Sequence, residues 1–267
     1  MLDPGRGKTK TGQLWAYARD DRPWEGSDPP GVAYVYAPDR KAERPIAHLA
    51  GFTGILQVDG YGGYRVLADK SGVTLAFCWA HVRRRFYELA VSGPAPIASE
   101  ALRRIGELYK IEDDIRGRSA NERRAMRQDK SRAIVIDLEP WLREKLGLIS
   151  QKTKLAEAIR YTLSRWEGLS RFLDDGRIEI DSNTVERSIR PIAMRESLCT
   201  PSSSICKHWK RVHVGNATRA TFSGHRRFDR PRCQVVSTDL IGCARNNLCS
   251  RKNAGFDKAP YRVICDA

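Results

Sequence analysis

The stretch Gly54-Ile-Leu-Gln-Val-Asp-Gly-Tyr-Gly-Gly-Tyr64 sets a short apolar run directly before an Asp-Gly turn. Such a run, bounded by turn residues, predicts a buried strand that ends at Asp59. The carboxyl end of a central strand is where an open α/β sheet usually holds its ligands. A carboxylate there is costly to bury unless it binds a cation or hydrogen-bond donors, so Asp59 is a candidate site residue. The alternative is an Asp that only caps its own turn.

The residues before this stretch predict two strands and a short helix. Gln13–Arg19 and Val32–Tyr36 are aromatic and β-branched, and the linker between them is rich in Pro and Gly. A short helix is expected over residues 40–50, where we interpret His48 as a surface or packing residue. The glycine-rich loop before residue 13 lacks the P-loop spacing, because Leu2 stands where the first glycine is required.

A second buried strand is predicted over residues 73–79, and it runs into a basic amphipathic helix over residues 80–89. Cys78 and His81 form a Cys-x-x-His pair across this junction. Two ligands do not make a zinc site, so a packing role is favoured for the pair. An arginine run in the same helix forms either a solvated helix face or a set of DNA phosphate contacts: Arg83, Arg84 and Arg85.

The pattern from residue 97 to about residue 173 is helical, with apolar residues spaced three or four apart. Ser119-Ala-Asn-Glu122 is a capping-box signature for a helix start. The helix that follows is expected to break or bend near Pro140. We interpret the apolar stripes as core packing and find no catalytic pattern in this segment.

The second informative stretch is Asp181-Ser-Asn-Thr-Val-Glu-Arg-Ser-Ile-Arg-Pro191. Asn183 is expected to cap a short helix that Pro191 stops. Glu186 then either closes a capping box or offers a carboxylate to the end of the sheet. Arg187 and Arg190 are available for phosphate.

The composition is that of a globular chain with an unusual last quarter. Of its 267 residues 41% are hydrophobic and 30% charged, and no apolar run approaches the ~18 residues of a membrane span. No secretory signal opens the chain, so the cytoplasm is the expected location. The net charge is +15, but residues 195–267 alone carry 14 Lys and Arg against 5 Asp and Glu. Charge over the whole chain is therefore weak support for DNA binding.

Four motifs together resemble the transposases of insertion sequence family 66. They are Leu2–Asp21, Gln57–Tyr64, Cys78–Phe86 and Asn183–Pro191, and the resemblance runs almost continuously to about Ala193. That family is similar to the DDE transposases, which have a ribonuclease H-like fold. By this resemblance Asp59 matches the second catalytic Asp and Glu186 the catalytic Glu. The Cys-x-x-His pair is a recurrent mark after the second Asp and is expected to brace the junction.

The resemblance implies a two-metal reaction on DNA. Asp59 and Glu186 would bind Mg²⁺ or Mn²⁺, and the ions would promote in-line attack on a phosphodiester. The partner would be DNA, both insertion-sequence ends and target, with nucleoid association, self-association and accessory transposition proteins implied as well. Basic residues near the sheet would hold the DNA backbone: Lys8, Lys10, Arg83, Arg84, Arg85, Arg187 and Arg190.

Two departures from the family qualify these expectations. The family's first catalytic Asp lies on a strand upstream of Leu2, so this chain is expected to lack it and to be truncated. That strand would be the central one, and its absence would leave its two neighbours with exposed edges. After about Met194 the family's C-terminal helices do not appear, and six cysteines but only three leucines follow. We interpret this tail as an out-of-frame reading or a fusion; a zinc module is the weaker alternative, using Cys199, Cys206, His208, His213 and Cys233.

The expected fold is therefore α/β (mixed α+β). An incomplete ribonuclease H-like mixed sheet spans 1–96, a helical insertion 97–173, the catalytic-glutamate helix 174–193, and a poorly ordered basic, Cys-rich tail 194–267. The expected function is a DDE-type transposase fragment for metal-dependent DNA strand cleavage and transfer, inactive alone. The alternative is a non-catalytic DNA-binding or interaction protein derived from a transposase.

Overall fold

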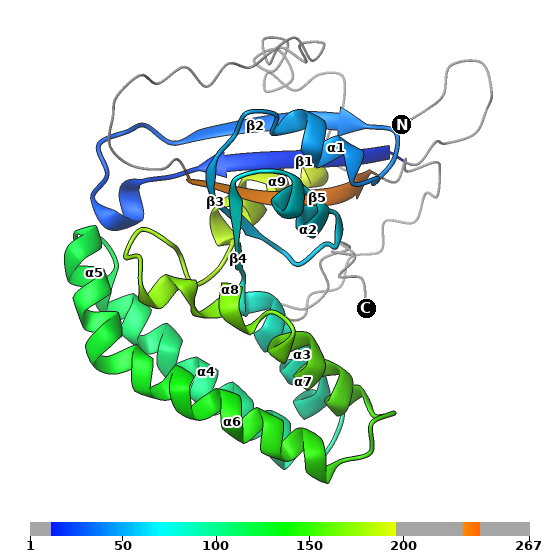
Figure 1. Cartoon of the computed structure of the whole chain (residues 1–267), viewed down its shortest axis with the longest axis vertical. Helices are drawn as coiled ribbons and strands as arrows, with labels where there is room; N and C mark the ends of the chain where they lie inside the picture. The colour runs from blue at the N-terminus through cyan, green and yellow to red at the C-terminus, as the bar shows by residue number, and fades with distance from the viewer. Residues whose placement is uncertain (1–11, 196–231, 241–267) are drawn as a thin grey trace, which may run out of the picture.

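The computed structural model describes residues 12–195 and 232–240 of the chain. It is a mixed α+β protein, as expected, with a sheet unit above an elongated helical unit (Figure 1). The strands are β1 Gly12–Arg19, β2 Gly31–Ala37, β3 Gly54–Val58, β4 Val73–Phe77 and β5 Arg232–Leu240. The helices near the sheet are α1 Glu43–His48, α2 Gly63–Lys70 and α9 Asn183–Arg195. The helical unit comprises α3 Trp79–Val91, α4 Pro96–Ile115, α5 Ala120–Met126, α6 Arg132–Leu148, α7 Lys154–Leu163 and α8 Trp166–Ser170.

The five strands form one sheet in the order β2-β1-β5-β3-β4. Strands β1 and β2 are antiparallel, β3 and β4 are parallel, and β5 joins the two pairs, antiparallel to β1 and parallel to β3. The expectation that β1 and β3 would expose unpaired edges is wrong, because β5 fills the position between them. In the predicted tail, residues 194–195 end α9 and residues 232–240 form a strand, while its other residues lie outside the described ranges, as do Lys8 and Lys10.

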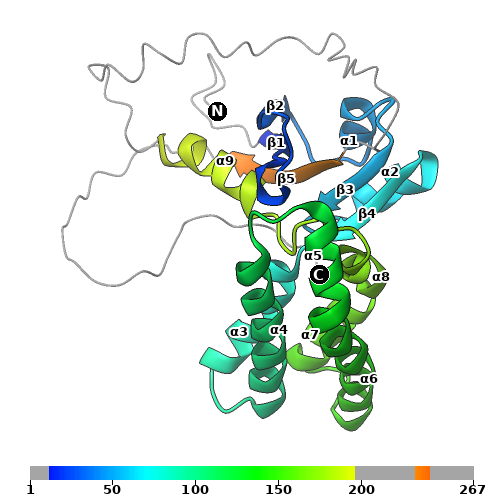
Figure 2. The ribbon, with the colours of Figure 1, turned by 90° about the vertical axis from the view of Figure 1, so that its left-hand side faces the viewer.

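The two faces of the sheet carry different side chains because successive residues of a strand point to opposite sides. On one face Trp15, Leu56 and Val58 pack with residues of α2 in one apolar cluster. On the other face Ala16 and Ala18 of β1 pack against Val185 and Ile189 of α9. Small alanine side chains allow α9 to lie close to the sheet, and Figure 2 shows α9 on the face opposite α1 and α2.

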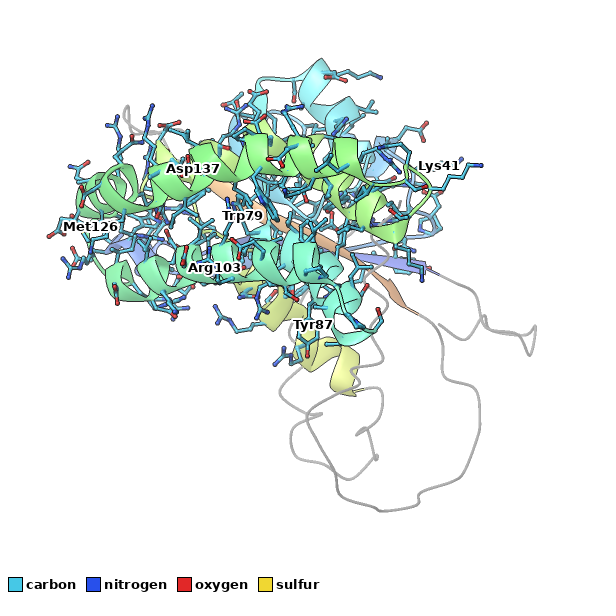
Figure 3. The ribbon with its side chains drawn as sticks, turned by 90° about the horizontal axis from the view of Figure 1, so that it is seen from below. Lys41, Trp79, Tyr87, Arg103, Met126 and Asp137 are labelled. Carbon is cyan, nitrogen blue, oxygen red and sulfur yellow. The ribbon has the colours of Figure 1, made fainter. Side chains whose placement is uncertain are left out.

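The helical unit has its own core, which confirms the packing interpretation of the apolar stripes. Ala101, Ile105 and Leu108 of α4 lie in one cluster with residues of α3, α6 and α7. Trp79 belongs to this cluster, and in the view from below it lies between α4 and α6 (Figure 3). Its indole N–H donates to the Leu169 carbonyl at 2.9 Å. Helix α3 therefore connects the sheet to the helical unit directly.

Helix ends confirm one sequence prediction and correct another. Ser119 caps α5 with the expected capping box, in which the Ser119 hydroxyl and the Glu122 carboxylate each bond the other's backbone N–H. A break or a bend was expected near Pro140; the break is wrong, because α6 continues through that residue. A proline in a helix interior costs about 3 kcal/mol, and burial of Leu138 and Leu142 on either side offsets that cost. The irregular turn comes earlier, as a π-helical segment over Arg127–Ser131.

Candidate functional site

Asp59 lies just past the end of β3, as predicted, and is buried with 4% of its surface exposed. The backbone N–H of Tyr61 donates to Oδ1 at 3.0 Å, which is the turn-capping bond of the alternative interpretation. Oδ2 has no hydrogen-bond donor among the described residues, and the Arg40 guanidinium lies 3.9 Å from it. Burial raises the pKa of the Asp59 carboxyl above its usual value, although the nearby His81 ring opposes this shift. Turn capping therefore explains only one of the two oxygens.

The turn after Asp59 is held by the helical unit. Gly60 has a φ of 102°, which side-chain-bearing residues rarely adopt. The Tyr161 hydroxyl of α7 donates to the Asp59 carbonyl at 3.0 Å, and Arg165 donates to the Gly60 carbonyl at 3.1 Å. The backbone that carries the carboxylate is thus positioned by side chains about 100 residues away in the chain.

Cys78 and His81 lie at the junction of β4 and α3, and both are buried. The Cys78 sulfur accepts from the backbone N–H and from the hydroxyl of Ser182, each at 3.2 Å. The backbone N–H of Trp79 donates to the Ile180 carbonyl at 3.0 Å. These contacts attach the junction to the segment that leads into α9. Ser182 had no role in the sequence prediction, and the only signal for it was its place in an Asp-Ser-Asn cap sequence.

Glu186 lies on α9 and faces the same junction. Its Oε1 lies 4.0 Å from His81 Nε2 and 3.3 Å from the Ser182 hydroxyl, whose single proton it shares with Cys78 Sγ, and the side chain is 26% exposed. The capping box with Asn183 does not form, because the Asn183 N–H donates to Asp181 Oδ1 at 3.0 Å instead. Glu186 therefore does not close a capping box with Asn183. The prediction that Pro191 stops this helix is wrong, since α9 continues to Arg195.

Three of these side chains lie close together. Cys78, His81 and Glu186 each offer a ligand atom, and these three atoms lie within 4.8 Å of one another. Asp59 is not a member of that group, but it follows β3 as Cys78 follows the neighbouring parallel strand β4. Both candidate carboxylates are thus associated with the ends of neighbouring strands.

The basic residues predicted to contact DNA differ in their surroundings. Arg83 and Arg84 are exposed on α3, and Arg187 and Arg190 are exposed on α9. Arg85 is engaged within the protein: its guanidinium lies 3.9 Å from the centre of the Tyr161 ring and 3.4 Å from the Glu157 carboxylate. Four of the five described arginines are therefore presented to solvent beside the candidate site.

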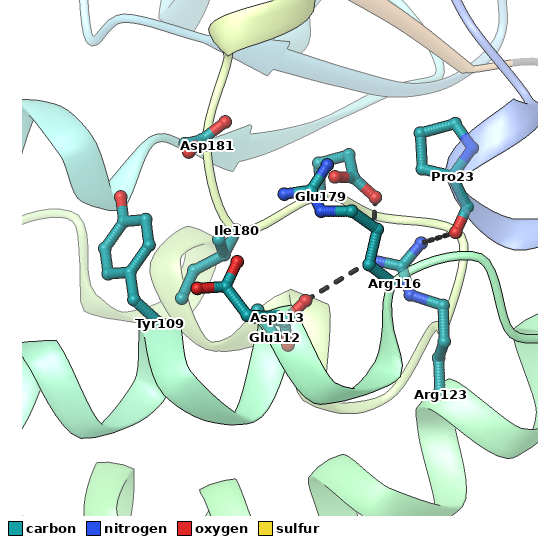
Figure 4. Close-up of a pocket in the computed structure, with 9 residues that line it drawn as sticks. All are labelled: Pro23, Tyr109, Glu112, Asp113, Arg116, Arg123, Glu179, Ile180 and Asp181. Atoms are coloured by element: carbon teal, nitrogen blue, oxygen red, sulfur yellow. Dashed lines mark hydrogen bonds and ion pairs between the residues drawn. The ribbon is translucent and has the colours of Figure 1, made fainter.

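A second charged centre lies where the helical unit meets the loops of the sheet unit, beside a small polar pocket (Figure 4). Glu112 of α4 accepts from Arg127 at 2.6 and 2.7 Å. Arg123 bonds the Glu179 carboxylate at 2.6 Å and the Pro23 carbonyl at 3.3 Å. Glu112, Arg123 and Arg127 are nearly inaccessible, so the ion pairs are buried. These ion pairs connect elements that are distant in sequence. The spacing of apolar residues in this region did not predict them.

None of the helices in the described part of the chain is long and apolar enough to cross a membrane.

Comparison with known proteins identifies relatives for most of the chain. A family model described as the transposase IS66 family matches residues 1–204. Three uncharacterized proteins of Sinorhizobium fredii, y4qI, y4jD and y4hP, are 50%, 46% and 42% identical to this chain, over 79%, 72% and 91% of its residues. These alignments cover 41%, 39% and 43% of the relatives, so the chain spans about two-fifths of their length. No solved structure matches the chain.

The alignment with y4hP covers 91% of this chain and therefore extends past Met194 into the tail. An out-of-frame origin of the tail stays a prediction. The family match covers Asp59, the Cys78–His81 pair and Glu186 together. The chain therefore belongs to the IS66 family of transposases.

Proposed function

We propose that this chain carries the catalytic domain of a DDE-type transposase, the class that cleaves and transfers DNA strands with divalent metal ions. The observation that carries the proposal is that Asp59 follows the end of β3 while His81, 4.0 Å from Glu186, follows the end of the neighbouring parallel strand β4. The carboxyl ends of neighbouring parallel strands are where open α/β sheets bind their ligands.

The sheet supports a ribonuclease H-like assignment. Its order is β2-β1-β5-β3-β4, with a central strand antiparallel to one neighbour and parallel to the other. Asp59 follows the strand next to the centre, and α9 brings Glu186 across one face. This is the arrangement in which the second Asp and the Glu of the resemblance would approach each other.

Asp59 and Glu186 are the residues that would hold Mg²⁺ or Mn²⁺. Hard oxygen donors suit these ions, and Asp59 Oδ2 is a buried carboxylate oxygen without a hydrogen-bond donor among the described residues. Bound there, the ions would stabilise negative charge on a DNA phosphodiester as it is cleaved. The protein's own contribution is to hold the Asp59 turn through Tyr161 and Arg165 and to keep Glu186 facing His81.

We further propose that this chain alone is inactive. Strand β5 occupies the centre of the sheet, and its Val235 pairs with Val58, the residue before Asp59. A valine therefore lies beside the end of β3, where a third carboxylate would complete the metal centre. Two carboxylates bind hard cations more weakly than three and do not fix two ions in register.

The exposed Arg83, Arg84, Arg187 and Arg190 support DNA as the partner, since such residues contact phosphates without reading sequence. Lys8 and Lys10 are proposed for the same role on sequence grounds. The same four arginines also support a second candidate function, a DNA-binding protein without catalysis. Self-association, accessory proteins and nucleoid association are proposals that follow from the family alone.

Thermal unfolding with and without Mn²⁺ tests the metal site, and a cleavage assay tests the activity. When millimolar Mn²⁺ is added to metal-free protein, the Tm of the wild type is expected to rise. The Tm of Asp59→Asn and that of Glu186→Gln should not change. Asp69→Asn, an exposed residue of α2, is the matched control and should show the same rise as the wild type. A Mn²⁺ shift that survives both site substitutions would overturn the metal assignment.

Cleavage is measured on duplexes that carry the terminal repeats of the element. The wild type is expected to give no products with Mg²⁺ or Mn²⁺ but to bind the duplex. Turnover that Glu186→Gln abolishes would overturn the inactivity, while DNA binding with no Mn²⁺ response at all would favour the non-catalytic alternative.

A further inference from the structure

The Cys-x-x-His pair acquires a third possible ligand only in the folded chain. Cys78 and His81 lie one helical turn apart at the start of α3, and α9 brings Glu186 against them. Their ligand atoms lie within 4.8 Å of one another, and a tetrahedral Zn²⁺ would draw them to about 3.5 Å, a movement within the reach of side-chain rotation. Two are donors that Mg²⁺ does not favour, because thiolate and imidazole suit softer ions such as Zn²⁺.

The surroundings of the sulfur favour its role as an acceptor. Cys78 Sγ receives two hydrogen bonds, from the backbone N–H and from the hydroxyl of Ser182. Donors aimed at a sulfur stabilise negative charge on it, and the thiolate is the form that binds metals. The Ser182 hydroxyl also lies 3.3 Å from Glu186 Oε1, so its single proton is shared between the sulfur and the carboxylate, while the Ser182 backbone N–H donates to the sulfur alone. One residue thus contacts two of the three ligands.

His81 directs one ring nitrogen toward the other possible ligands. Its Nε2 lies 4.0 Å from Glu186 Oε1, and the ring is buried at the junction of β4 and α3. Nε2 is therefore the ring nitrogen on the Glu186 side, where an ion shared with that carboxylate would bind.

We propose that Cys78, His81 and Glu186 form a Zn²⁺ site that fastens the β4–α3 junction to α9. Three protein ligands leave the fourth tetrahedral position to water, and the partly exposed Glu186 marks the side open to solvent. Binding releases the thiol proton of Cys78 to solvent, so affinity rises with pH. The site does not require strand cleavage, but it shares Glu186 with the proposed Mn²⁺ site, so Zn²⁺ and Mn²⁺ compete.

Cobalt substitution tests the site because Co²⁺ bound to a thiolate shows a sulfur-to-metal charge-transfer band. The full chain is used with its six other cysteines changed to Ser, namely Cys199, Cys206, Cys233, Cys243, Cys249 and Cys265. This background is expected to bind one equivalent of Zn²⁺ or Co²⁺ and to show the band. Cys78→Ser should abolish the band, and His81→Gln and Glu186→Gln should each weaken Zn²⁺ binding more than tenfold. Glu88→Gln, an exposed residue of α3, is the matched control and should bind as the background does.

The outcomes separate this proposal from the proposed function. Loss of the Zn²⁺ site in Cys78→Ser with an unchanged Mn²⁺ response supports the zinc site and leaves the hard-metal site intact. Binding that is unchanged in both Cys78→Ser and Glu186→Gln overturns the zinc site, whatever the Mn²⁺ result. If the six-serine background does not fold, the wild type and its Cys78→Ser variant are compared directly, and an equal charge-transfer intensity in the two overturns the proposal.

Discussion

His81 Nε2 lies 4.0 Å from Glu186 Oε1, although His81 belongs to α3 and Glu186 to α9, which helices α4 to α8 separate in sequence. His81 follows the end of β4, which pairs in parallel with β3, and Asp59 follows the end of β3. The contact between His81 and Glu186 therefore brings the predicted catalytic glutamate to the end of the strand next to the one that carries Asp59.

Removing the charge of Asp59 is expected to stabilise the metal-free protein. Burial raises the pKa of Asp59 in the folded state. The contribution of Asp59 to the free energy of unfolding is therefore complete below its unfolded pKa and is lost as the pH rises through its folded pKa. The free energy of unfolding of Asp59→Asn should therefore increase relative to that of the wild type between acidic and neutral pH. The difference is expected to reach roughly 1 kcal/mol or more at pH 7. Urea denaturation across pH 4–8 measures this. An advantage for the variant that shrinks with rising pH would contradict the prediction, and Asp69→Asn should show no trend.

Breaking the buried ion pairs should cost far more than breaking exposed ones. Arg127 is fully buried and bonds Glu112 through two nitrogens, so Arg127→Met leaves the buried Glu112 carboxylate with only its 3.3 Å contact to Arg123. Such a change typically costs about 3–5 kcal/mol. Arg143, 60% exposed and paired with Glu139, is the control, and Arg143→Met should change stability by less than about 0.5 kcal/mol. Equal losses in the two variants would show that the buried network does not stabilise the fold.

A proline in the central strand should disrupt the sheet. Val235 pairs with Tyr17 on one side and Val58 on the other, and Val235→Pro removes its backbone donor. One orphaned partner costs about 1–3 kcal/mol, and amides of β1 and β3 should exchange faster in hydrogen-exchange measurements. Val32→Pro on the edge strand β2 should be tolerated better. Unchanged protection of β1 and β3 in Val235→Pro would mean that β5 is not the strand that completes the sheet.

Neighbouring arginines of α3 are expected to behave differently toward DNA. Arg84 is exposed, so Arg84→Ala should weaken duplex binding and reduce the slope of log K against log salt by about 1. Arg85 is engaged by Glu157 and Tyr161, so Arg85→Ala should lower stability and leave the salt slope nearly unchanged. Filter binding between 50 and 200 mM salt compares them. A larger slope change for Arg85 than for Arg84 would contradict the assignment.

Local patterns in the sequence determined most of the secondary structure. The apolar run before Asp59 specifies β3, and Ser119 with Glu122 specifies the start of α5, because each pattern acts over a few neighbouring residues. The prolines were the exception. Pro140 and Pro191 both lie within helices. In α6, the packing of buried residues on either side of Pro140 outweighs the one missing backbone hydrogen bond.

The identity of the candidate carboxylates was also determined by the sequence, through the motifs around Asp59 and Glu186. Only the tertiary structure brought Glu186 and Ser182 to the Cys78–His81 pair, buried Glu112 against Arg127, and placed β5 between β1 and β3. The physical reason is that periodicity tells which residues share a face of one element. Which faces then meet depends on burial and backbone pairing between segments far apart in the chain, and no short stretch of sequence specifies that choice.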